Sequence, residues 1–194
     1  GLHGAKVGQN DLWGMRRIFI LVLVATGCSA LKVTPEMSAR EAYVARYASM
    51  ARAEMKRSGV PASITLAQGM LESGNGTSRL AVKGRNHFGI KCHKDWEGRR
   101  IFEDDDREQE CFRRYRSVRE SYRDHSDFLR TRKRYSALFE LEPDDYRAWA
   151  LGLQKAGYAT NPKYAERLTA LIEAENLQRF DRGAKRFARA RASR

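Results

Sequence analysis

The chain has 194 residues, a formal net charge of +13 and a hydrophobic content of 42%. This length supports one domain with its own core plus flanking segments, and three Trp, eight Tyr and eight Phe residues indicate a globular protein rather than a disordered one. The excess positive charge predicts a polyanionic partner, which would be nucleic acid, an acidic membrane surface or an anionic cell-wall polymer.

Residues 15–30 have the pattern of an export signal. Met15-Arg16-Arg17 is a basic region, and the apolar stretch that begins at Ile18 is too short to span a bilayer as a mature helix. Two processing schemes stay open: a lipoprotein signal in which Cys28 becomes the acylated first residue, or ordinary cleavage near Cys28. Residues 1–14 precede the expected initiator and are left out of the fold prediction. We therefore expect an exported protein of the bacterial cell envelope, periplasmic or anchored through a lipid.

Two helices are predicted before residue 80. Ser38 and Glu41 have the spacing of a capping box, and the helix that they open keeps an apolar periodicity up to Gly59. Pro61 opens the second helix, because proline is tolerated at the first helical position. Gly74 ends it.

The pattern changes at residue 87 and predicts a small antiparallel β-lobe. The runs 87–92, 99–103 and 110–115 have β-like composition and are separated by polar turn sequence. Cys92 and Cys111 fall in these runs, and their even number in an exported chain favours a disulfide over two separate thiols. The Cys and His residues lack the spacing of a zinc site, so we expect no metal.

Helices resume after the β-lobe. A capping box at Ser117–Glu120, then Pro143, then Asn161-Pro162 each predict a helix start. Helices, a small β-lobe and further helices indicate an α+β architecture with a cleft between the lobes. Residues 182–194 form a basic tail without an acidic residue. We expect this tail to be disordered against an anionic surface, with an amphipathic helix carrying Phe187 or a solvated tail as alternatives.

Glu72 is the strongest catalytic candidate. It ends an apolar helical segment, and the turn sequence 73–76 follows at once. The unpaired carbonyl groups at a helix end and burial against Met70 and Leu71 both raise the pKa of a carboxyl group. A carboxyl group that keeps its proton near neutral pH is what a general acid in glycoside cleavage requires. From position alone, a solvated Glu at a helix end is the competing interpretation.

Four motifs in register carry a family resemblance. They are Ala67-Gln68-Gly69-Met70-Leu71-Glu72-Ser73-Gly74-Asn75-Gly76, Asn86-His87-Phe88-Gly89-Ile90-Lys91, Phe112-Arg113-Arg114-Tyr115 and Ala156-Gly157-Tyr158-Ala159-Thr160-Asn161-Pro162-Lys163-Tyr164-Ala165. Together they strongly resemble the glucosaminidase domain of glycoside hydrolase family 73, which includes the flagellar-rod peptidoglycan hydrolase domain and autolysins of the mannosyl-glycoprotein endo-β-N-acetylglucosaminidase type. The resemblance covers about residues 38–181.

The resemblance implies a lysozyme-like fold, in which a mostly helical lobe and a small β-hairpin lobe flank a cleft. It implies an endo-β-N-acetylglucosaminidase that hydrolyses the β-1,4 bond between N-acetylglucosamine and N-acetylmuramic acid in peptidoglycan. Glu72 matches the catalytic acid of the family. A proton donor and a positioned water suffice for this chemistry, so no cofactor is expected.

The second catalytic carboxylate has more than one candidate. The family carries it on the β-lobe hairpin, where this chain has the acidic cluster 103–106. Strand alternation places Glu103 and Asp105 on one face and Asp104 on the other, and we prefer Asp105, with Asp104 next. An inverting enzyme holds its base roughly 6.5–9.5 Å from the acid. Assistance by the acetamido group of the substrate, with the Asp orienting it, and a merely solvated turn are the alternatives.

Four further residues are expected to bind substrate. Tyr158 matches the Tyr of the Gly-Tyr-Ala-Thr motif and would orient the sugar or the attacking water. Asn86 and Phe88 match a cleft-lining motif, with the amide of Asn86 for the acetamido group and the ring of Phe88 for the sugar face. Tyr164 lines the cleft or caps the core. Core packing is the competing interpretation for Tyr158 and Phe88.

Two other functions are consistent with parts of this pattern. A lytic transglycosylase shares the single Glu72, but the acids of the β-lobe and Tyr158 argue against it. A non-catalytic wall or nucleic-acid binder would use the positive charge, but export and a cleft with aromatic and acidic groups argue against nucleic acid. Peptidoglycan glycan strands are the expected partner, with membrane association through a lipid on Cys28 or through the basic tail.

Overall fold

The computed structural model describes residues 37–192 apart from 95, 106 and 107. The segment 1–14, the predicted export signal and Cys28 lie outside the described residues. No helix within the described ranges is both long enough and apolar enough to cross a bilayer.

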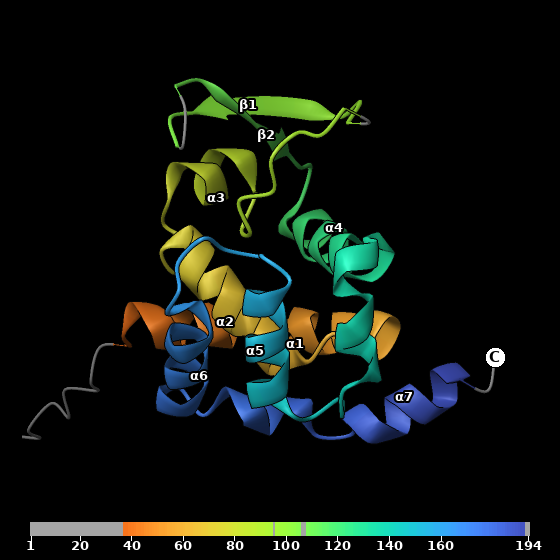
Figure 1. Ribbon diagram of the computed structural model, residues 1–194. Coiled ribbons are helices and arrows are strands. Elements are labelled where there is room, and N and C mark those ends of the chain that lie inside the picture. Colours follow the sequence, from red (N-terminus) through yellow and green to blue (C-terminus); the bar gives the residue numbers. More distant parts are fainter. Residues whose placement is uncertain (1–36, 95, 106–107, 193–194) are drawn as a thin grey trace, which may run out of the picture. The chain divides into compact units, whose positions relative to one another are not determined.

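The described elements follow the predicted order of helices, hairpin and helices. They are α1 (Ala39–Ser58), α2 (Ala62–Ser73), α3 (Arg79–Gly84), β1 (Arg99–Glu103), β2 (Glu110–Arg114), α4 (Val118–Thr131), the 3₁₀ helix η1 (Lys133–Glu140), α5 (Tyr146–Lys155), α6 (Tyr164–Ala174), the 3₁₀ helix η2 (Leu177–Asp181) and α7 (Ala184–Ala192). Figure 1 shows the hairpin at one end, next to α3, with the larger helical lobe beyond it. The predicted α+β class, a mostly helical lobe with a small antiparallel hairpin, is confirmed.

Helix α2 is the centre of the helical lobe. Its residues from Ala62 to Met70 are all buried, and α1, α5, α6 and η2 pack around it. A helix that is buried on every face must be surrounded by other elements, because no side of it can face water. At Gly69 an added Cβ would collide with the hydroxyl group of Tyr43 on α1. Glycine therefore allows the close approach of these two helices.

Asp181 closes the N-terminal end of α2. Its Oδ1 accepts a hydrogen bond from the backbone N–H of Ser63 at 2.9 Å, and its Oδ2 accepts one from the Ser63 hydroxyl at 2.5 Å. Both residues are buried. The first N–H groups of a helix have no partner within the helix, so this carboxyl group satisfies one of them and ties η2 to α2.

The β-lobe is a two-stranded antiparallel hairpin fastened by a disulfide. Ile101 faces Phe112 in the register, and both side chains are buried. The predicted disulfide between Cys92 and Cys111 is confirmed. Next to it, the backbone N–H of Cys92 donates to the carbonyl of Cys111 at 2.7 Å. The segment that leads into the lobe is thus held to β2 by a covalent bond and a hydrogen bond.

The prediction of a strand at 87–92 was wrong. Lys91 alone forms an isolated bridge there, opposite Phe112. Gly89 has a φ of 59°, a left-handed conformation that breaks an extended strand. The side chain of Asn86 holds the turn at Gly89, because its amide nitrogen donates to the carbonyl of Ile90 at 2.9 Å and its amide oxygen accepts from the N–H of Ile90. This segment is a clamped loop.

Helices α5 and α6 begin later than the prolines that predicted them. Helix α5 starts at Tyr146, because Asp145 accepts a hydrogen bond from the N–H of Ala148 and acts as its cap. Helix α6 starts at Tyr164, two residues after Pro162. The η1 segment between α4 and α5 was not predicted.

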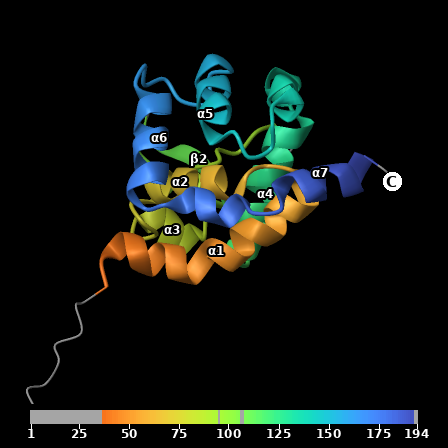
Figure 2. The same ribbon diagram turned by 90° about the horizontal axis from the view of Figure 1, so that it is seen from below.

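The basic tail forms a helix over most of its length. Helix α7 covers Ala184–Ala192, and Ala184 is buried. The helix packs against α1, as Figure 2 shows from below. Its Lys185 lies 3.3 Å from a carboxylate oxygen of Asp144. The expectation of a disordered tail therefore fails for these residues, and the helical alternative holds.

Loss of the disulfide is expected to destabilise the β-lobe. The bridge spans 19 residues of sequence, and cross-linking a loop of this size stabilises a fold by about 3 kcal/mol. The double variant Cys92→Ser/Cys111→Ser should unfold at lower temperature than the oxidised protein, and a reductant should lower the melting temperature of the wild type but not of the variant. Equal melting temperatures for the oxidised wild type and the variant would contradict a stabilising role.

Asp181 is expected to make stability depend on pH. Burial raises its pKa from 3.8 to about 6, although the hydrogen bonds from Ser63 act in the opposite direction. The folded state therefore binds this proton more tightly than the unfolded chain. The resulting contribution to stability is complete below pH 3.8 and is lost as the pH rises through about 6. In Asp181→Asn, whose side chain does not titrate, the free energy of unfolding should change less between pH 4 and pH 6.

Urea unfolding at several pH values measures this difference. Glu166→Gln, which removes an exposed carboxyl group of α6, is the matched control and should keep the wild-type slope. A wild-type slope in Asp181→Asn would show that the buried carboxyl group does not set the pH dependence.

Candidate active site

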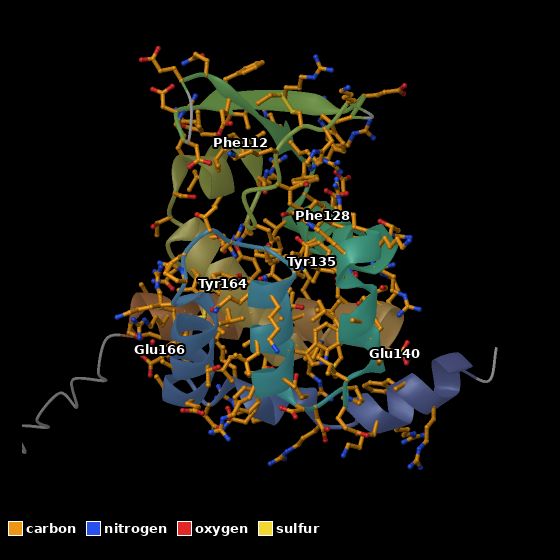
Figure 3. All side chains as sticks on the ribbon, viewed as in Figure 1. Phe112, Phe128, Tyr135, Glu140, Tyr164 and Glu166 are labelled. Carbon is orange, nitrogen blue, oxygen red and sulfur yellow. A yellow bond between two sulfur atoms is a disulfide. The ribbon has the colours of Figure 1, made fainter. Side chains whose placement is uncertain are left out.

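A cavity of about 220 Å³ contains Glu72 and aromatic side chains from several elements. Glu72 comes from the end of α2 and Phe88 from the clamped loop. Phe128 comes from α4, Tyr135 from η1 and Tyr158 from the segment after α5. Figure 3 shows Phe128 and Tyr135 toward α4, and Tyr164 on α6. The four aromatic residues and the acid thus converge from parts of the chain that are far apart in sequence.

A roomier groove, about 660 Å³, is lined by α1 and by the segment that follows α6. Its acidic side chains already have structural partners. Glu41 accepts from the backbone of Ser38 in the capping box of α1, and Glu175 pairs with Arg40 at 3.3 Å. We place the candidate site in the smaller cleft, because there a partly exposed acid lies among aromatic side chains.

Glu72 lies at the exit of the buried helix. The next-but-one residue, Gly74, has a φ of 56° and ends α2. Part of the Glu72 side chain is exposed, while the packed walls still desolvate its carboxyl group, and this desolvation is the largest influence on its pKa. The pKa of Glu72 is raised overall. A carboxyl group that is reachable from outside yet poorly solvated matches the prediction from sequence.

Three neighbouring residues shift the pKa of Glu72 in addition to desolvation. Tyr164 donates a hydrogen bond to Oε1 of Glu72 at 3.3 Å, which lowers the pKa of the acid. The positive charge of Arg167 also lowers it, and the negative charge of Asp105 raises it. The interaction with Asp105 shows that the hairpin carries a carboxylate within electrostatic reach of Glu72.

Tyr164 belongs to a chain of buried polar groups. Its hydroxyl accepts a hydrogen bond from Nε2 of Gln68 at 2.9 Å, and Oε1 of Gln68 lies 3.0 Å from Nε2 of His125. Burial lowers the pKa of His125 to about 3, so its ring is neutral. Phe88 stacks on that ring at 4.0 Å between centroids. Tyr164, expected either to line the cleft or to cap the core, therefore contacts the acid directly from a buried position.

Tyr158 forms the aromatic wall between Tyr164 and Tyr135. Its ring stacks on that of Tyr164 at 5.7 Å between centroids and lies 6.2 Å from that of Tyr135. Burial raises the pKa of Tyr158, and the charge of Glu72 raises it further. The phenol is therefore neutral and lies near the acid, which agrees with its expected place in the cleft.

Asn86 has a different task from the expected one. It is fully buried, and its amide nitrogen donates to the carbonyl groups of Ile90 and Arg113. Its amide oxygen accepts from the backbone N–H groups of Phe88 and Ile90. The expected contact with an acetamido group is corrected, because the side chain already uses its hydrogen-bonding capacity to clamp the loop.

Phe88 is 3% exposed and packs against His125 and Tyr122. It lies under the wall of the cleft, so its packing role, the competing interpretation from the sequence, dominates. Only a small part of its ring is open to a sugar.

Asp105 and Asp104, the two candidates for the second catalytic carboxylate, have different partners in the structure. Asp105 pairs with Nζ of Lys91 at 2.9 Å, and the same Lys91 pairs with Glu110 at 2.5 Å. Asp104 accepts a hydrogen bond from the backbone N–H of Gln109 at 2.8 Å and so closes the turn of the hairpin. Glu103 pairs with Arg79. Of these acids, Asp105 is the one that influences the pKa of Glu72.

Sequence reasoning missed Gln68, His125, Lys91 and Arg167. Gln68 had a usable signal, because it precedes Glu72 by four residues and so shares its face of α2. Lys91 lay inside a quoted motif without a role. Nothing in the local sequence of His125 or Arg167 indicated that the fold would bring them to the acid. In the part of the chain that the structure describes, no group of three His, Cys, Asp or Glu side chains is arranged to hold a metal ion.

Comparison with known proteins identifies the family. Residues 48–177 match the Glucosaminidase family model, described as mannosyl-glycoprotein endo-β-N-acetylglucosaminidase. The exo-glucosaminidase LytG of Bacillus subtilis is 32% identical over 163 residues, which are 77% of this chain and 56% of LytG. The peptidoglycan hydrolase FlgJ of Salmonella typhimurium is 35% identical over 68% of this chain and 45% of FlgJ. The chain thus spans about half the length of the curated relatives that it matches.

Solved structures share the fold. The catalytic domain of the autolysin Auto from Listeria monocytogenes superposes with a TM-score of 0.64 at 27% identity, over 78% of this chain and 92% of that domain. A peptidoglycan hydrolase from Sphingomonas sp. A1 gives a TM-score of 0.63 at 30% identity, over 74% of this chain and 94% of the other. Because the family model matches well over half of the residues, the chain belongs to the glucosaminidase family, glycoside hydrolase family 73.

Proposed function

We propose that this domain is an endo-β-N-acetylglucosaminidase that hydrolyses the β-1,4 bond between N-acetylglucosamine and N-acetylmuramic acid in peptidoglycan. The observation that carries the proposal is Glu72, an accessible carboxyl group with a raised pKa at the end of a buried helix. Membership of the glucosaminidase family supports the bond specificity. A wall substrate implies an exported protein of the bacterial envelope, and we propose that location too.

Glu72 acts as the general acid. Its raised pKa keeps a proton available to the oxygen of the leaving sugar, and breaking the glycosidic bond requires this proton transfer. Tyr164 fixes the carboxyl group through Oε1, and the aromatic wall of Tyr158 faces the apolar side of a sugar ring.

Asp105 is our candidate for the second group. The hairpin positions it, and the ion pair with Lys91 fixes its carboxylate. On the opposite side of the sugar from Glu72, it would activate a water or orient the acetamido group of the substrate. Asp104 is the weaker candidate because its carboxylate already closes the hairpin turn.

Glu72→Gln should abolish wall lysis while the fold persists. The amide keeps the shape but has no acidic proton, and removal of a general acid costs about 10²–10⁴-fold in rate. Lysis is measured as the loss of turbidity of purified peptidoglycan, with circular dichroism to verify folding. Full activity in a folded Glu72→Gln protein would refute the assignment.

Mass spectrometry of the soluble products tests the reaction itself. Fragments that end in reducing N-acetylglucosamine support the proposed bond, whereas anhydro sugars indicate a lytic transglycosylase. Long fragments early in the digestion indicate endo cleavage. Single disaccharides from the first minutes would indicate exo cleavage, the activity named for LytG.

Asp105→Asn and Asp104→Asn form a matched pair that locates the second group. If Asp105 is the partner, Asp105→Asn should lower the rate by about 10²-fold or more, and Asp104→Asn should have a much smaller effect. Loss of the negative charge of Asp105 also lowers the pKa of Glu72. The alkaline limb of the rate profile should therefore move to lower pH in Asp105→Asn only. Wild-type rates in both variants would exclude this placement and leave substrate assistance.

A further inference from the structure

The polar chain behind Glu72 contains a buried ring nitrogen that has no partner among the described residues. His125 is fully buried, and its Nδ1 has no hydrogen-bond partner there. The ring is neutral, so one of its two nitrogens carries the proton. A proton on Nδ1 would leave a buried N–H group unsatisfied, which costs more than an under-used acceptor lone pair. The tautomer with the proton on Nε2 is therefore favoured.

This tautomer sets the direction of every hydrogen bond that follows. The Nε2–H of His125 donates to Oε1 of Gln68, over 3.0 Å. The amide nitrogen of Gln68 must then face Tyr164 and donate to its hydroxyl oxygen, over 2.9 Å. With that oxygen occupied as an acceptor, the proton of the Tyr164 hydroxyl points to Oε1 of Glu72.

We propose that Gln68 and His125 are positioning residues that make Tyr164 a hydrogen-bond donor to Glu72 and thereby restrict the acidic proton of Glu72 to Oε2. The inference rests on the proposed function of Glu72 as the general acid. Oε1 of Glu72 already accepts from Tyr164, and Oε2 has no hydrogen bond from any described residue. The proton is thus on the oxygen that is left for the leaving group.

The hydrogen bonds that link His125, Gln68, Tyr164 and Glu72 keep their donor-to-acceptor direction because the linked groups are buried. Gln68 is fully buried and Tyr164 is 3% exposed, so water does not compete for their polar groups. Phe88 stacks on His125 with planes inclined by only 14°, which holds the ring orientation. Reversal of the chain would require a flip of the Gln68 amide and a change of tautomer at the same time.

The opposite direction predicts the opposite effect on Glu72. If Tyr164 donated to Gln68 instead, its oxygen would accept a proton from Glu72 and would stabilise the protonated acid. Tyr164→Phe would then lower the pKa of Glu72. In our proposal Tyr164 stabilises the carboxylate, so Tyr164→Phe raises that pKa. Arg167 on α6, Asp105 on the hairpin and Tyr158 also act on or lie near Glu72. The cleft around Glu72 is further lined by four charged or titratable side chains, those of Lys91, His93, Arg134 and Tyr135. The substitution leaves all of these groups in place.

The test is a ¹³C NMR titration of the Glu72 carboxyl carbon, assigned by comparison with Glu72→Gln. We expect an upward shift of the pKa in Tyr164→Phe and a smaller upward shift in Gln68→Met, because the unsupported phenol is a weaker donor. The double variant should titrate like Tyr164→Phe alone, since Gln68 acts through Tyr164. Tyr122→Phe removes another buried phenol, which bonds to Tyr43, and should leave the titration unchanged.

Three outcomes would overturn the proposal. A downward shift in Tyr164→Phe would show that the chain runs in the opposite direction. An unchanged titration in a folded Gln68→Met would show that Gln68 only stabilises the fold. Additive shifts in the double variant would show that Gln68 reaches Glu72 by another route. Tyr164→Phe preserves the packing of the ring, so its sign decides the direction even if Gln68→Met does not fold.

Turnover then separates this proposal from the proposed function. In an active enzyme, Tyr164→Phe should lower kcat on the order of tenfold, the effect of one hydrogen bond, with little change in KM. If the titrations behave as expected but the wild type does not cleave peptidoglycan, the polar chain stands and the proposed function fails.

Discussion

The burial of α2 on every side is the constraint on which the rest of the structure depends. Its residues from Ala62 to Met70 are shielded from water, so the polar groups at its two ends must find their partners inside the protein. At the first end Asp181 accepts from the backbone N–H of Ser63, and at the second the N–H of Gly74 donates to the carbonyl of Met70. Glu72 is therefore fixed by the core and not by a loop, which gives the proposed proton donor a defined position.

The sequence predicted those parts of the fold that depend on local chemistry. The capping box at Ser38, the side-chain cap at Ser117 and the turn at Gly74 were correct, because each follows from groups within one helical turn. The second half of the box predicted at Ser117 does not form, since the Glu120 carboxylate accepts from the N–H of Arg116 instead. The segment 87–92 was misread, since its apolar residues alternate like a strand. It is a loop because of Asn86, whose bonds reach as far as Arg113. Such non-local bonds leave no periodic signal.

The residues of the candidate site were likewise predictable only where local sequence carried the signal. Glu72 was chosen as the candidate acid from its place at the end of an apolar helix and from its motif, and the structure places it in a cleft with aromatic side chains. Asn86 lies in an equally good motif, yet its side chain holds the loop. A motif reports that a residue is needed, but the contacts decide whether it meets a ligand or the protein itself. Gln68 and His125 show the reverse case, because burial makes them look like core residues and only the geometry connects them to the acid.

The two carboxyl groups at the ends of α2 show why one is structural and the other suits catalysis. Desolvation raises the pKa of both. Asp181 is 3% exposed and binds Ser63 with both of its oxygens, so its proton and charge are confined to the core. Glu72 binds Tyr164 with one oxygen and is open on the other side. Burial thus serves to hold the fold at one end of the helix and to raise the pKa of an acid at the other. The difference is that one carboxylate oxygen of Glu72 accepts no hydrogen bond from a described residue.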